Sequence, residues 1–229
     1  MPNSIKSRNA FFLFFIIVLI IDISIKINYE IINLRFISKS ILSILLMIYF
    51  FVYNRELLKI KWFFMIMALL FFLIGDIFFI LYEIELYYIF GIFSFTFGKL
   101  FYIFRFSNQN DFKFKQLLPV LFLCFSLMIT VLFLINDNLN NFFFPTLLYL
   151  FIVTLLFVFT FLRKGMVSKK SYYMVFLGVI LSLFSDFLTA LSSFYVEIPY
   201  NGIGIMLFYG LSQLFIVFGI VEETNPCKL

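Results

Sequence analysis

Two aspartates interrupt long apolar runs of this 229-residue sequence, and they are the residues best suited to chemistry. Asp76 lies within the apolar segment Phe71–Phe79, and Asp186 lies within Leu181–Leu188. An ionised side chain in the hydrocarbon of a bilayer costs roughly 3 kcal/mol or more, so such an aspartate usually has a function and needs a partner. A neutral carboxyl beside an ionised one can act as general acid and general base. We therefore predict that Asp76 and Asp186 are catalytic.

A second interpretation of the same aspartates involves no chemistry. Each carboxylate could accept hydrogen bonds from a neighbouring helix and serve only helix association. Trp62 to Asp76 and Tyr172 to Asp186 are each 14 residues, which at about 1.5 Å per residue places both carboxylates at a similar depth in the membrane. If their two helices pack together, the carboxylates form a pair, and we favour this functional interpretation.

The apolar runs predict an all-α fold, a membrane bundle of about eight transmembrane helices. Hydrophobic residues make up 64% of the sequence and its mean hydropathy is +1.12, which is too apolar for a soluble globule of this length. A helix needs about 20 apolar residues to cross about 30 Å of hydrocarbon, and the runs lack the alternation of barrel strands. We expect residues 1–229 to form a single domain. Its spans are predicted at about residues 11–21, 37–53, 62–82, 86–104, 117–135, 142–162, 172–194 and 200–221.

Basic residues predict the orientation of these spans, because cytoplasmic loops of membrane proteins are enriched in Lys and Arg. Both residue types are frequent between the second and third, fourth and fifth, and sixth and seventh spans. Neither occurs in the loops at residues 82–85, 136–141 and 195–200. Both termini are therefore expected in the cytoplasm. The first outer loop is the exception, since it carries Lys26 and Arg35; Lys26 can neutralise Asp22 one turn away, so we assign Asp22 a structural role.

The separation of 110 residues between Asp76 and Asp186 suggests an internal repeat. The same shift brings Lys99 into register with Tyr209. Two four-helix halves in parallel orientation would produce this pattern, because an even number of helices returns the chain to its starting side. The alternative is that helical membrane proteins in general space their spans in a similar way.

Composition excludes several classes of function. The sequence contains no His, which excludes His-ligated zinc proteases and Ser/His hydrolases of the membrane, and we expect no metal and no other cofactor. The net charge of +5 comes from basic residues at the ends of the spans, so these residues are topology signals and no nucleic-acid partner is expected. The expected surroundings are the lipids of a bacterial cytoplasmic membrane, while the oligomeric state does not follow from the sequence.

Five further polar residues on the apolar spans are candidate site residues. Lys39 opens the second span and could reach a lipid phosphate or the aspartates, although a lysine that extends to the membrane surface is the alternative. Lys99 lies deep in the fourth span and needs an acidic partner or a long reach to the cytoplasmic side. Tyr209 and Gln213 stand at i and i+4 on one helix face, and Tyr102 is the fifth candidate. Taken singly, such residues more often form hydrogen bonds between helices than act in catalysis.

Several short segments resemble the YhhN-like family of membrane proteins, which includes the lysoplasmalogenases. They occur in the order typical of the family, from about residue 37 to 220. The segments are Lys39 near the start of the second span, Met67–Asp76, Phe97–Tyr102, Phe184–Ala190 and Tyr209–Gln213. The chain departs from the usual pattern at two positions, since Ser40 stands where the family usually has Pro and Lys99 where it usually has His.

The resemblance implies hydrolysis of the 1-alkenyl ether bond of a lysoplasmalogen to a fatty aldehyde and a glycerophospho-base. An enol ether is cleaved by protonation of its carbon, which gives an oxocarbenium-like ion that water attacks. One neutral aspartate could supply the proton, and the ionised aspartate could stabilise the cation and activate the water. The lysophospholipid substrate would then be bound through its phosphate by Lys39. The remaining candidates would hold substrate or water: Lys99, Tyr102, Tyr209 and Gln213.

Two other functions fit the same residues. The first is a carrier for lipids or small solutes, in which the two aspartates take up and release protons. The second is a family member that acts on a different lipid ether or has a structural role only. Release of aldehyde from lysoplasmalogen would separate the enzyme from both alternatives, and transport that depends on a proton gradient without any product would indicate the carrier.

Overall fold

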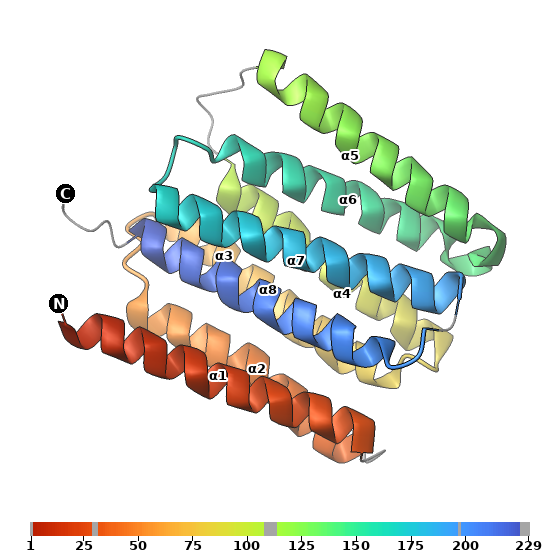
Figure 1. Ribbon diagram of the computed structural model, residues 1–229, viewed down its shortest axis with the longest axis horizontal. Helices are drawn as coiled ribbons and strands as arrows, with labels where there is room; N and C mark the ends of the chain where they lie inside the picture. Colours follow the sequence, from red (N-terminus) through yellow and green to blue (C-terminus); the bar gives the residue numbers. More distant parts are fainter. Residues whose placement is uncertain (1, 29–31, 108–113, 197, 225–229) are drawn as a thin grey trace.

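The computed structural model describes residues 2–28, 32–107, 114–196 and 198–224, and this part of the chain is a bundle of α-helices without a strand (Figure 1). Eight of its helices are long and apolar enough to cross a membrane. The predicted all-α membrane fold is therefore confirmed. The helices are α1 (Pro2–Asn28), α2 (Ile32–Tyr53), α3 (Lys59–Phe78), α4 (Glu85–Phe106), α5 (Phe114–Ile135), α6 (Phe143–Leu162), α7 (Lys169–Phe194) and α8 (Asn201–Thr224).

The helices differ in how closely they join the bundle. The most extensive packing is between α7 and α8 and between α3 and α4, and α4 also packs on α6. Helices α1 and α2 lie together at one edge of the bundle and contact α8 much less extensively, while α5 lies at the opposite edge (Figure 1). α1 begins and α8 ends at the same end of the bundle. We call this end the terminal end and the opposite end the distal end.

Apolar side chains occupy both the interior and the outer surface of the bundle. Leu46, Tyr102 and Val217 belong to the main buried cluster and come from α2, α4 and α8. On α5, Phe122 and Phe133 are 77% and 83% exposed. Helices that are apolar on all sides are typical of membrane spans, whose outer faces contact acyl chains. Because apolar residues occur throughout, the few buried polar side chains mark where a functional site could lie in this interior.

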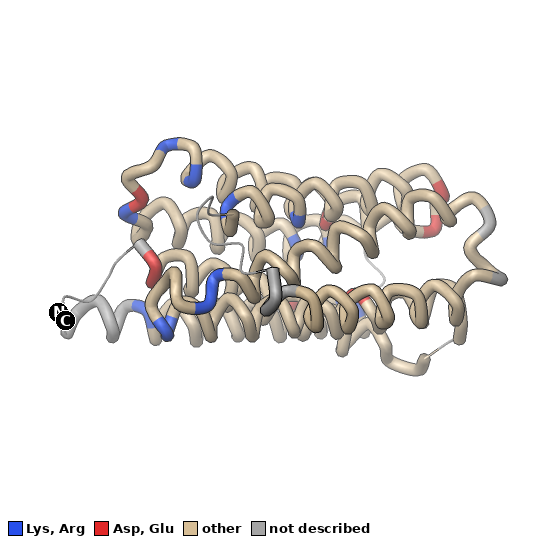
Figure 2. The backbone as a smooth tube through the Cα atoms, turned by 90° about the horizontal axis from the view of Figure 1, so that it is seen from above, with Lys and Arg blue, Asp and Glu red and all other residues tan. Residues whose placement is uncertain are grey.

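Most of the basic residues lie at the terminal end, as Figure 2 shows. There Arg105 on α4 forms ion pairs with Glu56 at 2.9 Å and Glu223 at 3.3 Å, and Arg163 also pairs with Glu223. Both arginine side chains are buried. These pairs hold together the terminal ends of α4 and α8, the α2–α3 connection, which carries Glu56, and the α6–α7 connection, which carries Arg163. The charge distribution is the one from which cytoplasmic termini were predicted, while the orientation and the four-helix repeat stay predictions.

Two glycines allow α7 and α8 to approach closely. A Cβ atom added at Gly178 on α7 would lie 2.9 Å from the carbonyl oxygen of Ser212, and one added at Gly219 on α8 would lie 3.0 Å from that of Ser171. Backbone atoms cannot move aside as the end of a flexible side chain can. Small residues at contacts of this kind are typical of helix pairs in membranes, where close packing drives association.

We expect the Gly178→Ala variant to lower the thermal stability of the protein in detergent, because overpacking against the backbone of α8 costs about 1–3 kcal/mol. Gly204→Ala is the matched control, since its Cβ would meet one flexible atom, Cδ1 of Leu188, at 3.2 Å. Because alanine favours a helix over glycine, the control should be neutral or more stable. Equal melting temperatures for both variants would contradict the close contact of α7 and α8.

Candidate functional site

Asp76 on α3 is a buried carboxylate with three polar partners. The Nζ atom of Lys39 on α2 lies 3.3 Å from Oδ1 of Asp76. The hydroxyls of Ser43 on α2 and Tyr209 on α8 both donate hydrogen bonds to Oδ2, at 2.9 Å and 3.0 Å. The Asp76 residue is 1% exposed, and a buried carboxylate is stable only with partners of this kind. Three helices therefore meet at one ionisable group.

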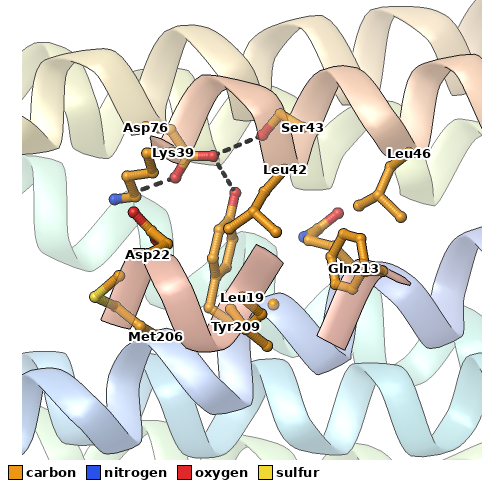
Figure 3. A pocket seen from close by; sticks show the side chains of 12 residues that line it. Leu19, Asp22, Lys39, Leu42, Ser43, Leu46, Asp76, Met206, Tyr209 and Gln213 are labelled. Carbon is orange, nitrogen blue, oxygen red and sulfur yellow. Dashed lines mark hydrogen bonds and ion pairs between the residues drawn. The ribbon is translucent and has the colours of Figure 1, made fainter. Parts of the chain in front are cut away.

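A cavity of about 20 Å³ adjoins Asp76, which is space for about one water molecule. Helices α1, α2, α3 and α8 surround it (Figure 3). Its polar lining consists of Asp22, Lys39, Ser43, Asp76, Tyr209 and Gln213. Its apolar lining consists of Phe15, Leu19, Leu42, Leu46, Met206 and Gly210. The cavity thus combines a carboxylate, a cation and hydroxyls with an apolar wall.

Asp186 on α7 forms a second site with a lysine of its own. The Nζ atom of Lys99 on α4 contacts Oδ2 of Asp186 and donates to the hydroxyl of Ser182 at 2.9 Å. The hydroxyl of Tyr149 on α6 donates to Oδ1 of Asp186 at 2.6 Å, and the Lys99 nitrogen lies 4.9 Å from the centre of the Tyr149 ring. Lys99 is 2% exposed. Asp186 is therefore the acidic partner that the depth of Lys99 required.

The structure does not join Asp76 and Asp186 as the pair that their shared depth predicted. Each carboxylate binds a different lysine, and Asp186 is not among the residues that line the cavity beside Asp76. The physical reason is the helix arrangement, because α3 packs mainly on α4 whereas α7 packs mainly on α8. Equal depth along two helices does not fix which way their side chains point.

Two tyrosines lie between these sites. Tyr209, which binds Asp76, is within electrostatic range of Tyr149, which binds Asp186. The two lysine–aspartate sites are therefore neighbours, and in each of them a tyrosine hydroxyl donates to the carboxylate.

The predicted substrate-binding residues separate into two groups. Lys39, Tyr209 and Gln213 line the cavity together with Asp76. Tyr102 lies behind them on α4 and donates a hydrogen bond from its hydroxyl to Oε1 of Gln213 at 2.7 Å. Lys99, the fifth candidate, belongs to the site of Asp186.

Three residues of these sites were not predicted. Ser43 follows Lys39 by four residues and Ser182 precedes Asp186 by four, so each serine lies one helical turn from a predicted residue on the same face. That spacing is a signal that could have found them. Tyr149 has no such signal, because its place beside Asp186 depends on how α6 packs.

Asp22 on α1 also belongs to the surroundings of the cavity. It was assigned a structural role with Lys26, and the structure places the two within electrostatic range of each other. In addition, Asp22 is 1% exposed, lines the cavity and accepts a hydrogen bond from the hydroxyl of Ser38 on α2. It therefore connects α1 to α2 beside Lys39.

Comparison with protein families gives one match, to the model of the YhhN family, over residues 34–220. The chain belongs to the YhhN family. The matched region includes Lys39, Asp76, Lys99, Asp186 and Tyr209, which together carry both lysine–aspartate sites. Comparisons with curated proteins and with solved structures give no match.

We expect the Lys99→Met variant to lose about 3 kcal/mol of stability, because it leaves the Asp186 carboxylate without its cation in the interior of the bundle. Adding Asp186→Asn to this variant should restore most of the loss, since the unpaired charge is then removed. Thermal unfolding of the two single variants and the double variant in detergent measures the coupling. Additive losses, with the double variant the least stable, would contradict the ion pair.

Proposed function

We propose that this YhhN family member hydrolyses the 1-alkenyl ether bond of lysoplasmalogens, releasing a fatty aldehyde and a glycerophospho-base. The single observation that carries the proposal is the buried carboxylate of Asp76 beside a cavity of water size, enclosed by apolar helices. The reaction needs a proton donor, a water molecule and little else. The resemblance to a family that includes lysoplasmalogenases supports the same reaction.

The two oxygens of Asp76 have different surroundings, which suggests different roles. Oδ2 accepts hydrogen bonds from both Ser43 and Tyr209, and these bonds fix the orientation of the carboxyl group. Oδ1 is buried and has no hydrogen-bond partner; its neighbour is the Lys39 ammonium at 3.3 Å. We assign the proton transfer to Oδ1 because it is the oxygen with free capacity.

The reaction then proceeds in two steps with Asp76 as acid and base. The cycle begins once the Asp76 carboxylate has taken up a proton: in the first step, the carboxyl gives this proton to the alkenyl carbon that is not bonded to oxygen, and the neighbouring carbon becomes part of an oxocarbenium ion. The carboxylate formed stabilises this cation, and Lys39 stabilises the carboxylate. In the second, Asp76 takes a proton from water as the water oxygen bonds to the cationic carbon. The hemiacetal that results separates into aldehyde and alcohol.

Asp186 has a supporting role in this proposal. It lies outside the cavity lining. We therefore propose that Asp186 orients the Tyr149 hydroxyl and, through Tyr149, the nearby Tyr209. Lys99 holds Asp186 in place through the buried ion pair. The second aspartate would thus act through the orientation of hydroxyl groups and not by contact with the substrate.

Entry of a lipid requires movement of the cavity wall, because about 20 Å³ cannot hold an alkenyl chain. Helices α1 and α2 form this wall and pack on α8 less extensively than α7 does. Separation of α1 and α2 from α8 would therefore break less packing than separation of α7 from α8. It would also open the cavity to the surrounding bilayer, where a single-chain lipid resides.

We expect purified protein in detergent to release aldehyde from lysoplasmalogen, and Asp76→Asn to lower the rate at least 100-fold because the amide cannot donate or accept the proton. Asp186→Asn should lower the rate less, since Asp186 acts through other residues. Glu83→Gln is the matched control, because Glu83 is an exposed carboxylate outside the cavity lining. It should leave the rate unchanged.

Two results would contradict the proposal. The first is the absence of aldehyde from the wild-type protein, and the second is an Asp76→Asn variant as fast as the wild type. Substrate movement that depends on a proton gradient, with no aldehyde formed, would instead favour the carrier. The two buried lysine–aspartate pairs are the observation that supports this second candidate, because each pair can exchange a proton.

A further inference from the structure

Three cations lie near one another at the distal end of the bundle, and the reaction at Asp76 uses only Lys39, the one that lines the cavity. They are Lys26 at the end of α1, Arg35 in the first turns of α2, and Lys39. Lys26 is within electrostatic range of both Arg35 and Lys39. Like charges at such distances repel one another, so this arrangement is costly unless an anion joins it.

The cations on α2 are in register with the site of Asp76. Arg35, Lys39 and Ser43 stand at i, i+4 and i+8, so they share one face of the helix. Four residues of helix rise about 6 Å. Lys39 therefore lies about one turn, and Arg35 about two turns, to the distal side of the serine that binds Asp76. These residues of α2 thus form a row that leads from the Asp76 carboxylate toward the distal end of the bundle.

The carboxylates that line the cavity do not balance these cations. Asp22 and Asp76 are the acidic residues in the lining and Lys39 is the basic one, while Lys26 lies within electrostatic range of Asp22, Lys39 and Arg35. Asp76 is already paired with Lys39. Arg35 forms no ion pair with a described carboxylate, and its buried Nε atom has no hydrogen-bond partner. Among the described residues, the three cations therefore exceed these two carboxylates by one positive charge.

The beginning of α8 adds to this positive potential. A Cβ atom at Gly202, in the first turn of α8, would lie 2.5 Å from the Nζ atom of Lys26. The ammonium group therefore lies directly against a helix N-terminus, where the backbone N–H groups carry partial positive charge. An ammonium group is unfavourable there, whereas an anion that contacts both the ammonium group and the helix N-terminus is favourable.

The terminal side of the cavity carries no charged group among its lining residues. Figure 3 shows Leu46 there, away from Lys39, together with the neutral amide of Gln213. A molecule that fits this order has an anionic group, then the reacting atoms, then a hydrocarbon chain. In a lysoplasmalogen, the three-carbon glycerol unit separates the phosphate from the alkenyl ether in this order.

We propose that Lys26, Arg35 and Lys39 bind the phosphate of a single-chain glycerophospholipid at the distal side of the cavity. The inference rests on the proposed function for the place of the ether bond at Asp76. It explains why the first outer loop carries Lys26 and Arg35 against the usual charge rule. Substrates without a phosphate, such as an alkenylglycerol, lack the group that these cations bind.

The test measures binding of lipids that the protein cannot cleave, so that it does not depend on hydrolysis. The probes are a 1-alkyl-glycerophosphocholine and the corresponding 1-alkylglycerol, each added to the full-length protein in nonionic detergent. We expect the Lys26→Gln, Arg35→Gln double variant to bind the phospholipid at least tenfold more weakly and the alkylglycerol equally well. Lys59→Gln is the control, because Lys59 is an exposed cation at the start of α3, at the terminal end. Its affinities should equal those of the wild type.

A second readout separates a binding site from a structural cluster. Without lipid, the Arg35→Gln single variant should melt at the same temperature as the wild type or higher, because Arg35 has no ion pair with a described carboxylate and its removal lessens repulsion with Lys26. Unchanged phospholipid binding by the double variant, or equal weakening for both lipids, would overturn the phosphate site. So would inorganic phosphate bound as tightly as the phospholipid. Normal phosphate-dependent binding without aldehyde release would support this site and contradict the proposed reaction, so the two failures can be told apart.

Discussion

The ion pair between a lysine and an aspartate, one of them buried and the other half-buried, is the interaction on which the interior of this protein depends. A charge in hydrocarbon is stable only when an opposite charge and hydrogen bonds replace its water. Lys39 with Asp76 joins α2 to α3, and Lys99 with Asp186 joins α4 to α7. Hydroxyl groups satisfy the remaining oxygens. The second pair joins helices that pack mainly on other neighbours, and both pairs place reactive groups inside an otherwise apolar bundle.

The two pairs have different access to the cavity, and this difference organises the proposed function. The Asp76 carboxylate borders a cavity, whereas the Asp186 carboxylate is held by Lys99, Ser182 and Tyr149 away from it. Part of the cavity wall comes from α1 and α2, which pack on α8 much less extensively than α7 does. The charged side chains Asp22 and Lys39 lie toward the distal end of the cavity, while Leu46 and the neutral amide of Gln213 lie toward the terminal end. A single-chain lipid with its head group distal would place its phosphate near the cations.

The helices and most of the site could be predicted from the sequence, because hydropathy and charge act locally along the chain. Eight apolar runs gave eight helices, and the depth of Lys99 indicated an acidic partner. The grouping of Asp76 with Asp186 could not be predicted, since it depends on which helices pack and how each is rotated. Tyr149 was missed for the same reason. Ser43 and Ser182 were within reach of prediction, because each lies one turn from a charged residue on its own helix.

In the proposed reaction, the protein adds a proton to the alkenyl carbon of a lysoplasmalogen. The most direct measurement is the isotopic composition of the aldehyde released in deuterated water, trapped by immediate reduction and analysed by mass spectrometry. We predict one deuterium on the carbon next to the carbonyl, in a product that the Asp76→Asn variant does not form. Aldehyde without deuterium on that carbon, or the same labelled aldehyde from the variant at the wild-type rate, would contradict the claim.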